Sequence, residues 1–449
     1  MQILQKANTT PNKLYQTKSH CELSDLLINS SSSLTHGGYV HDTCSHSKLI
    51  KGMKGIGKSS VLQTYVKSTL HPNVVKLYVS CDGVWTPGCH VLQKKNILHV
   101  IETALAERGI EVLPRKGNDS LGDNLIRALT KNGLYVLLVL DEFEELYRLS
   151  PNDPLNAVLG PQVKASLYAL QWLLGQNSGR FLVMLCGSSA NCTNLISLSA
   201  DQIEFPGQAQ AAKLNSTKLS PFVVSAPTFT DIEAVHGLLA NMGLPCSVKE
   251  ARMVAFGFGA NACNVQRLAQ SMKNGGSSSS VSALSRWTLR NKAAVGMSKG
   301  ESIFLKAVLN RARHENQALL DRLSNKVTKQ LDANLIMDDE KWAQEFKPLT
   351  RRQLGEVWDE LLRQHRDLFA GLNIEHVLLT LRDRNVLQLD EGIMSEHSDQ
   401  YYPMCLADVF LDSDQEVVDT MHANFSPFYD EFDRTIKVRI ARAVKESIA

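Results

Sequence analysis

The chain has 449 residues, with 43% hydrophobic and 21% charged residues and a formal net charge of +2. This length exceeds one ordinary core and the composition excludes a disordered chain, so we expect two or three domains. The balanced charge excludes a globally basic nucleic-acid-binding protein, and no apolar run approaches the roughly 20 residues that span a bilayer. The start lacks an apolar signal core and the nine cysteines are scattered, so we expect an intracellular protein, in the cytoplasm or nucleus.

Polar residues dominate the first part of the chain, 1–47, which includes the serine run Ser30–Ser33. We interpret it as mostly a flexible leader, with Glu22–Ile28 as a candidate short helix. Residues 48–226 then alternate strand-like apolar runs with helical stretches, which is typical of a parallel α/β sheet with helices on both faces. The strand-like runs are Val74–Ser80, Leu134–Leu140, Phe181–Leu185 and Phe222–Ser225, and the helical stretches are Lys58–Leu70, Lys95–Arg108, Leu121–Lys131 and Val163–Leu174.

A glycine-rich segment, GMKGIGKS, occupies residues 52–59 and matches the pattern G-x-x-x-x-G-K-[ST]. Glycines let such a loop curl so that its backbone N–H groups point at phosphates, and the following helix directs its positive end at the same anion. Lys58 would place a charge at the β/γ-phosphates, and the Ser59 hydroxyl would bind Mg²⁺. A glycine-rich turn that matches by chance is the alternative. The residues predicted to bind the nucleotide here are Gly52, Gly55, Ile56, Gly57, Lys58, Ser59 and Ser60.

Further polar residues end two of the predicted strands. Asp141-Glu142 ends the second strand-like run, and in P-loop enzymes a carboxylate at this place holds Mg²⁺ while a neighbouring Glu polarises the attacking water. We therefore expect Asp141 to hold the metal and Glu142 to act in catalysis together with Lys58. Ser188 or Ser189, after the next strand, is a candidate to orient that water. An ordinary capped strand end and a Gly-Ser turn are the structural alternatives.

A smaller helical region is predicted at 227–274, followed by a linker at 275–280, GGSSSS. The pair Thr230-Asp231 is typical of a helix start. Arg267 is a candidate second contact to the nucleotide, with a solvated helix residue as the alternative. Helices are expected at Ile232–Met242, Val248–Phe256 and Asn261–Met272.

The remaining residues, 281–449, are predicted to form a mainly helical domain. Ile374–Leu381 carries an apolar stripe at helical spacing, and Val386–Leu389 with Tyr401–Leu406 is compatible with a hairpin, so the end of the chain resembles a winged helix. The exposed side of the last helix is expected to carry charges of both signs, which argues against strong attraction to phosphates. Contact with a protein partner and binding of DNA both stay open. The residues expected on that side are Glu375, His376, Thr380, Arg382, Asp383 and Arg384.

Four segments in this order, GMKGIGKSS, LYVLLVLDEFEELY, FLVMLCGSS and GFGANACNVQRL, resemble the AAA+/STAND branch of P-loop ATPases. The order is similar to that of archaeal-type ATPases and the origin-recognition group, and also to the NTPase domains of Crinkler and retrotransposon-hot-spot proteins. The resemblance implies ATP with Mg²⁺ as ligand, a parallel P-loop NTPase sheet, a helical lid and a winged helix. It places Ser188 or Ser189 as a sensor and Arg267 as a second sensor.

The chain departs from this family in the strand that leads into the glycine-rich loop. Only Leu49 and Ile50 are apolar there, after the polar stretch His41–Lys48. Either this strand is very short or the amino-terminal part differs from a complete ATPase. Three rivals to an ATPase therefore stay open, namely a nucleotide-binding switch with little turnover, an ATP-controlled DNA-binding protein and a host-directed effector. The oligomeric state stays open as well.

Overall fold

The computed structural model divides the chain into two compact units, which meet in sequence after Val224. The short segment 53–57 groups with the second unit. The structure describes residues 18–35, 47–52, 55–88, 90–113, 120–147, 154–175, 179–188, 219–224, 227–241, 246–273, 297–330, 341–383, 386–390, 400–403 and 405–410. None of the helices within these ranges is long and apolar enough to cross a membrane.

The first unit is an α/β structure around a parallel sheet, which confirms the predicted fold class. Its described strands follow the order β2-β3-β4-β1-β5, and every neighbouring pair is parallel. The strands are β1 (Ser47–Gly52), β2 (Val74–Ser80), β3 (Tyr135–Asp141), β4 (Phe181–Ser188) and β5 (Leu219–Val224). The helices are α1 (Lys18–Thr35), α2 (Lys58–Lys67), α3 (Ile97–Ala106), α4 (Leu121–Lys131) and α5 (Pro154–Gly175), with short 3₁₀ turns η2 (Val91–Gln93) and η3 (Phe143–Tyr147).

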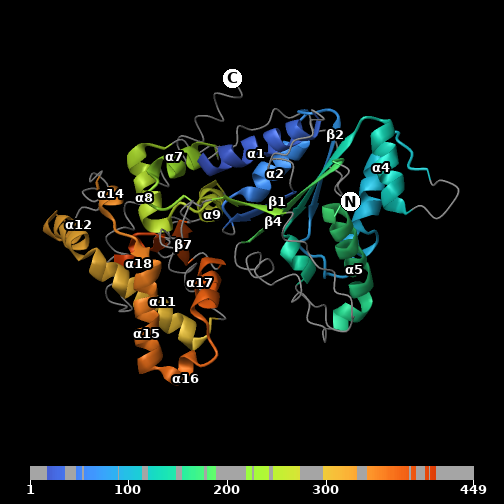
Figure 1. The fold of residues 1–449 in the computed structure, drawn as a ribbon. Helices are drawn as coiled ribbons and strands as arrows, with labels where there is room; N and C mark the ends of the chain where they lie inside the picture. The colour runs from blue at the N-terminus through green and yellow to red at the C-terminus, as the bar shows by residue number, and fades with distance from the viewer. Residues whose placement is uncertain are drawn as a thin grey trace. The chain divides into compact units, whose positions relative to one another are not determined.

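Helices cover both faces of this sheet. Figure 1 shows α1 and α2 on one side of the sheet and α4 and α5 on the other. Successive side chains of a strand point to opposite faces, so a strand covered on both faces is apolar at every position. On β3, Val136, Leu138 and Leu140 join the core with α3, α4 and α5, and the intervening Leu137 and Val139 are buried as well. The continuous apolar run of β3 therefore reflects burial on both faces.

The strand before the glycine-rich loop is a full strand in the interior of the sheet, with a neighbour on each side. Over Ser47–Gly52, β1 pairs with β4 on one side and β5 on the other. A central strand receives ladder hydrogen bonds from both neighbours, so backbone pairing stabilises it although only Leu49 and Ile50 are apolar. The departure noted in the sequence therefore leaves the sheet intact at this strand.

The leader predicted for residues 1–47 is helical over part of its length, which corrects the expectation of a flexible segment there. The helix α1 runs from Lys18 to Thr35 and includes the whole serine run. Leu23 and Leu27, one turn apart, are fully buried, so tertiary packing stabilises the helix despite its polar composition. Serine hydroxyls also bond back to helical carbonyls, as Ser32 does to Ile28 at 2.9 Å and Ser33 to Asn29 at 2.9 Å.

The second unit combines the region predicted as a lid with the carboxy-terminal helices around one shared hydrophobic core. Phe229 lies at the centre of an aromatic cluster, with its ring 6.1 Å from Trp342, 5.0 Å from Phe346 and 6.1 Å from Tyr402. The structure thus joins segments predicted to belong to separate domains. The helices are α7 (Ile232–Asn241), α8 (Val248–Phe258), α9 (Ala262–Lys273), α11 (Lys299–Glu315), α12 (Gln317–Gln330), α14 (Trp342–Glu345), α15 (Arg351–Gln364), α16 (Arg366–Phe369), α17 (Ile374–Asp383) and α18 (Ala407–Phe410).

A small antiparallel sheet completes the second unit. Its order is β6-β8-β7, with β6 (Leu349–Thr350), β7 (Leu387–Asp390) and β8 (Gln400–Pro403). The hairpin predicted after Ile374–Leu381 is therefore present as β7 and β8. Arg382 was expected on the exposed side of the preceding helix, but it is only 5% exposed. Its long apolar stem favours burial beside the core, which its position in the helix alone does not predict.

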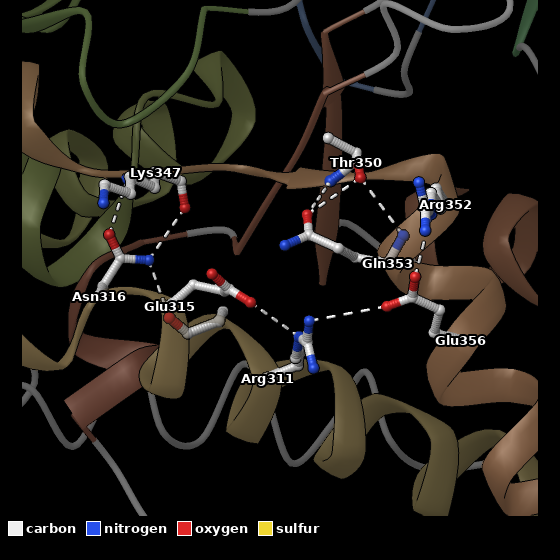
Figure 2. Close-up of polar contacts among 9 residues, drawn as sticks. Arg311, Glu315, Asn316, Lys347, Thr350, Arg352, Gln353 and Glu356 are labelled. Carbon is white, nitrogen blue, oxygen red and sulfur yellow. Dashed lines mark hydrogen bonds and ion pairs between the residues drawn. The ribbon is translucent and has the colours of Figure 1, made fainter.

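Polar side chains tie together the segments around α11 and α15 (Figure 2). The Asn316 amide donates to the Lys347 carbonyl at 2.9 Å and accepts from the Lys347 N–H at 2.7 Å. Arg311 bridges Glu315 on its own helix, at 2.9 Å, and Glu356 on α15, at 3.7 Å. Asn316 is buried, whereas the ion pairs are partly exposed, so the amide contributes more to stability than the ion pairs do.

Candidate nucleotide-binding site

The glycine-rich loop connects the end of β1 to the start of α2. Gly55 and Gly57 have φ angles of +81° and +98°, a backbone region that side chains with a Cβ rarely adopt. Lys58 is 7% exposed, and its Nζ donates to the carbonyl of Gly52 at 3.0 Å. The ammonium group therefore lies back over the loop, close to the chain that would surround a phosphate.

The start of α2 supplies further donors beside the loop. The helix begins at Lys58, so the N–H groups of its first turn, from Lys58 to Ser60, lack partners inside the helix. These groups and the positive end of the helix dipole favour an anion at this place. Ser59 is half-buried and Ser60 is exposed. Of the predicted phosphate-binding residues, the structure describes Gly52 at the end of β1 and residues 55–60 up to the first turn of α2, while Met53 and Lys54 lie outside the described residues.

The carboxylates of Asp141 and Glu142 follow at the same edge of the sheet. Asp141 pairs with Cys186 of β4, and Cys186 pairs with Ile50 of β1, two residues before Gly52. Since all these strands are parallel, their carboxyl ends meet at one edge, and β3 and β1 lie two strand spacings apart, about 10 Å. Asp141 is only 3% exposed, so a buried carboxylate stands at the edge where the loop begins.

Both carboxylate oxygens of Asp141 accept hydrogen bonds. Tyr78 on β2 donates its phenolic hydroxyl to Oδ2 at 2.5 Å, and the N–H of Glu142 donates to Oδ1 at 3.2 Å. Sequence reasoning missed Tyr78, which stands inside an apolar run and carries no motif. Its only signal is a hydroxyl in a buried strand, which is common in structural tyrosines.

Glu142 adopts a φ of +52°, in the left-handed region that a non-glycine residue seldom occupies. Its carbonyl accepts from the N–H of Glu145 at 3.0 Å, which closes a turn directly after the strand. Phe143, the next residue, is fully buried and anchors this turn in the core. Backbone strain of this kind clusters at functional sites, where the surrounding structure holds it.

Burial and neighbouring carboxylates change the acidity of two groups near Asp141. Burial, and then the hydrogen bond to Asp141, raise the pKa of Tyr78, while a side-chain hydrogen bond from Gln63 of α2 lowers it. Burial also raises the pKa of the Cys81 thiol, and the charge of Asp141 adds to this effect. Tyr78 is therefore a hydrogen-bond donor, and Cys81 a neutral thiol, at ordinary pH.

The loop after β2 packs on the acidic segment. The N–H of Cys81 donates to the Asp141 carbonyl at 2.8 Å, and the indole N–H of Trp85 donates to the Glu145 carbonyl at 2.6 Å. The His90 ring lies 2.5 Å from the Ser80 carbonyl through Nε2, while its Nδ1 accepts from the Leu92 N–H at 3.0 Å. The backbone of the turn that carries Glu142 is thus hydrogen-bonded at Asp141, just before Glu142, and at Glu145, three residues after it.

Within the second unit, Gly55 contacts the start of α9. The Gly55 carbonyl accepts from the N–H of Cys263 at 3.0 Å, and a Cβ added at Gly55 would lie 2.8 Å from the Cβ of Cys263. Asn261, which is fully buried, accepts from the N–H of Cys263 at 3.0 Å and so caps the helix. The close approach excludes any larger residue at position 55.

The two sensor candidates are placed by their backbone. Ser188 ends β4 and pairs with Gly52, the last residue of β1. It therefore lies beside the residue at which the glycine-rich loop begins. Ser189 lies outside the described residues. Arg267 lies on α9 in the second unit.

The donors at this edge fit Mg²⁺. The Ser59 hydroxyl and the Asp141 carboxylate are hard oxygen ligands, and the buried carboxylate is already oriented by two hydrogen bonds. Among the described residues no cluster of three or more His, Cys, Asp or Glu forms a metal cage. Mg²⁺ needs none, since it is usually held by one or two protein oxygens, waters and substrate phosphates.

A parallel sheet in which an interior strand leads through a glycine-rich loop into a Lys-Ser helix start, and in which another strand ends in a buried Asp, defines the P-loop NTPase fold. Solved structures similar in fold include the Walker-type ATPase of Pyrococcus abyssi, at 12% identity over 88% of this chain and 95% of that one, with a TM-score of 0.44. The ADP form of the Aeropyrum pernix ORC2 protein is 14% identical over 97% of each chain, with a TM-score of 0.40.

The Aeropyrum pernix ORC1 protein, solved in complex with DNA, is also similar, at 12% identity over 90% of this chain and 91% of that one, with a TM-score of 0.36. These three solved structures are thus of a Walker-type ATPase and of two proteins named ORC1 and ORC2. At these identities the likeness concerns the fold alone. No protein-family model matches the sequence, and none of the curated proteins matches it.

Proposed function

We propose that this chain binds ATP with Mg²⁺ at the glycine-rich loop and hydrolyses it, as a P-loop ATPase of the AAA+/STAND type. The observation that carries the proposal is the strand order, because parallel β1 and β3 bring the loop and the pair Asp141-Glu142 to one edge of the sheet. Neither motif alone specifies a triphosphate site, whereas the two together match its requirements. We propose ATP rather than GTP as the nucleotide because the resembled family uses ATP.

In this proposal the loop amides and the start of α2 bind the phosphates, from Gly52 to Ser60. Lys58, whose ammonium already lies over the loop, stabilises charge that develops on the transferred phosphate. Ser59 and Asp141 hold Mg²⁺, which neutralises phosphate charge when it is bound. Hydrolysis then depends on positioning and electrostatics more than on covalent chemistry.

The remaining roles concern the attacking water and the rest of the chain. Glu142 polarises the water or accepts a proton from it. Its strained turn fixes the backbone position from which the carboxylate side chain extends. Ser188 orients the water, and Arg267 senses the nucleotide. We further propose that the nucleotide state controls the helical region 227–274 and the residues after it.

The first test compares wild type with Glu142→Gln. We expect Mg²⁺-dependent ATP turnover in the wild type and a loss of roughly 10²- to 10⁴-fold in the variant, since a general base contributes about this much. Nucleotide binding, recorded in the same samples, should persist because the loop is untouched. Glu145→Gln is the matched control, since it makes the same change three residues further along, outside the pair Asp141-Glu142, and it should keep most of the turnover.

Each other result has a definite meaning. Full turnover in Glu142→Gln would show that another group handles the water. Binding without turnover in the wild type would favour a nucleotide-dependent switch over an ATPase. A chain that binds no nucleotide at all would refute the proposal.

A second candidate role concerns the end of the chain. We infer that α15, α17 and the small sheet form a winged helix that contacts DNA or a protein, and the pairing of β8 with both β6 and β7 after these helices supports this proposal. Glu375 on α17 is exposed and pairs with Arg351 of α15, so the described exposed charge on this helix includes a carboxylate, which does not attract phosphates. A DNA affinity that falls steeply with salt would support DNA binding, and a flat or absent response would favour a protein partner.

A further inference from the structure

Tyr78 is the polar group at the sheet edge that the motif-based roles leave unexplained. It lies on β2 two residues before Ser80, which pairs with Asp141, and its side chain reaches across to that carboxylate. The hydroxyl contacts Oδ2 at 2.5 Å, a short distance typical of a hydrogen bond to a charged oxygen. A phenylalanine would fill the same space in the core without this bond.

The same phenol also contacts the helix that follows the glycine-rich loop. Gln63 of α2 lies near the phenol, and its side chain lowers the pKa of Tyr78. Gln63 lies four residues after Ser59, so it is about one helical turn further along α2 than the residues proposed to bind phosphate and metal. One side chain therefore connects the helix of Lys58 and Ser59 with the strand of Asp141.

Asp141 is held at both oxygens and at its own backbone. Oδ2 accepts from Tyr78, Oδ1 accepts from the Glu142 N–H at 3.2 Å, and the Asp141 carbonyl accepts from the Cys81 N–H at 2.8 Å. Each carboxylate oxygen can accept two hydrogen bonds, so both keep capacity for a metal or its waters. The two side-chain bonds fix the plane of the carboxylate without using it up.

We propose that Tyr78 is a positioning residue: its hydroxyl orients the Asp141 carboxylate for a divalent cation and couples it, through Gln63, to the helix that carries Lys58 and Ser59. This inference rests on the proposed function, since the cation is the one that accompanies ATP. When a group that hydrogen-bonds to a metal ligand and orients it is removed, the metal affinity commonly falls by about 10- to 100-fold. Tyr78 would act on the cation and leave the binding of phosphate by the loop unchanged.

The test compares the affinity of the chain for Mn²⁺, a paramagnetic substitute for Mg²⁺, in wild type and Tyr78→Phe. Mn²⁺ is titrated by electron paramagnetic resonance in the presence of a non-hydrolysable ATP analogue, and analogue binding is also measured in EDTA. We expect Tyr78→Phe to bind Mn²⁺ about tenfold more weakly, with metal-free analogue affinity unchanged. Thermal unfolding is recorded for each variant, so that a loss of fold is recognised.

Two further variants keep the test sharp. Tyr135→Phe makes the same change on β3 at the opposite end of the strand, where the ring stacks against Arg180 at 4.6 Å, and it should leave Mn²⁺ affinity unchanged. Gln63→Leu removes the contact from α2 and should weaken Mn²⁺ binding less than Tyr78→Phe does. Because Gln63 is only half-buried, this variant tests the coupling even if Tyr78→Phe fails to fold.

The outcomes separate the inference from the function on which it rests. Unchanged Mn²⁺ affinity in both Tyr78→Phe and Gln63→Leu, beside a wild type that binds the metal with nucleotide, would reduce Tyr78 to a packing residue. Tighter Mn²⁺ binding in Tyr78→Phe would show that the phenol competes with the cation, which also overturns the inference. A wild type without metal-dependent nucleotide binding would refute the proposed function itself.

Discussion

Different kinds of contact stabilise the two units of this protein internally. In the first, strands with near-continuous apolar runs pair in parallel, and the polar groups proposed to act on nucleotide stand at the strand ends. In the second, Phe229 lies near the centre of the core and contacts residues more than a hundred positions further along the chain, such as Trp342 and Tyr402. The first unit thus separates stability from chemistry, because its core and its site occupy different parts of each strand. The second concentrates its stability in a few long-range contacts.

Phe229→Ala should show the largest effect on the second unit. Removing a fully buried ring from the centre of an aromatic cluster costs roughly 3–5 kcal/mol in the free energy of unfolding. Hydrogen exchange resolved by peptide should show lost protection in α8 and α14 and little change in β3. Leu362→Ala, at an exposed position on α15, is the control. An equal loss of protection in β3 would abolish the distinction between the units.

Lys58→Ala probes the first unit, where the expected loss is in binding. Deleting a charge that lies over the loop should weaken triphosphate binding by roughly 10- to 100-fold, since a charge-assisted hydrogen bond contributes about 1.5–3 kcal/mol. Calorimetric titration of ATP measures this, and thermal unfolding should change little. Lys67→Ala, at the exposed far end of α2, is the matched control. If the two variants bind ATP as well as wild type does, the loop is no nucleotide site.

Asn316→Ala sharpens the contrast within the second unit. The amide pairs with both the N–H and the carbonyl of Lys347, so its loss should cost about 2 kcal/mol by leaving these backbone groups unpaired. Chemical denaturation measures the change. The neighbour Gln317 bonds only to Asp321 at the exposed surface, and Gln317→Ala should be nearly neutral. Equal costs for the two variants would show that burial of the amide contributes nothing.

The smallest effect is expected at the start of α7. The Asp231 carboxylate accepts from the Ala234 N–H at 3.1 Å and so caps the helix. Asp231→Ala should cost about 1 kcal/mol, whereas Asp231→Asn should be within a few tenths, because asparagine caps equally well. Thermal unfolding of the two variants provides the measurement. A large loss in Asp231→Asn would indicate that the charge, rather than the cap, matters here.

Local patterns in the sequence predict much of the first unit. The run Val74–Ser80 corresponds to β2 exactly, and Leu121–Lys131 corresponds to α4 exactly. The start of α2 at Lys58 also follows from the motif. These features are encoded within stretches of seven to eleven residues, where apolar periodicity and turn chemistry act locally. The candidate phosphate-binding residues were therefore accessible without a structure.

The end of the chain was less accessible, as Arg382 shows. The apolar stripe of α17 predicted its buried face, yet Arg382 is buried too. The helix in the first part of the chain is longer than expected for a related reason. Its composition is mostly polar, yet Leu23 and Leu27 are buried and stabilise it. Both cases depend on what packs against a helix, which no property of the helix itself reveals.

By itself, the sequence determined that this protein carries a glycine-rich loop, a strand ending in two carboxylates and an α/β frame between them, because each is written in contiguous residues. Only the tertiary structure decided that β1 lies between β4 and β5, that Tyr78 donates to Asp141, and that the helices after Phe229 share one core with the end of the chain. These features depend on the register between strands and on contacts between segments far apart in sequence. Such contacts form only when loop closure and burial are satisfied together, and so they leave no periodic signal in the chain.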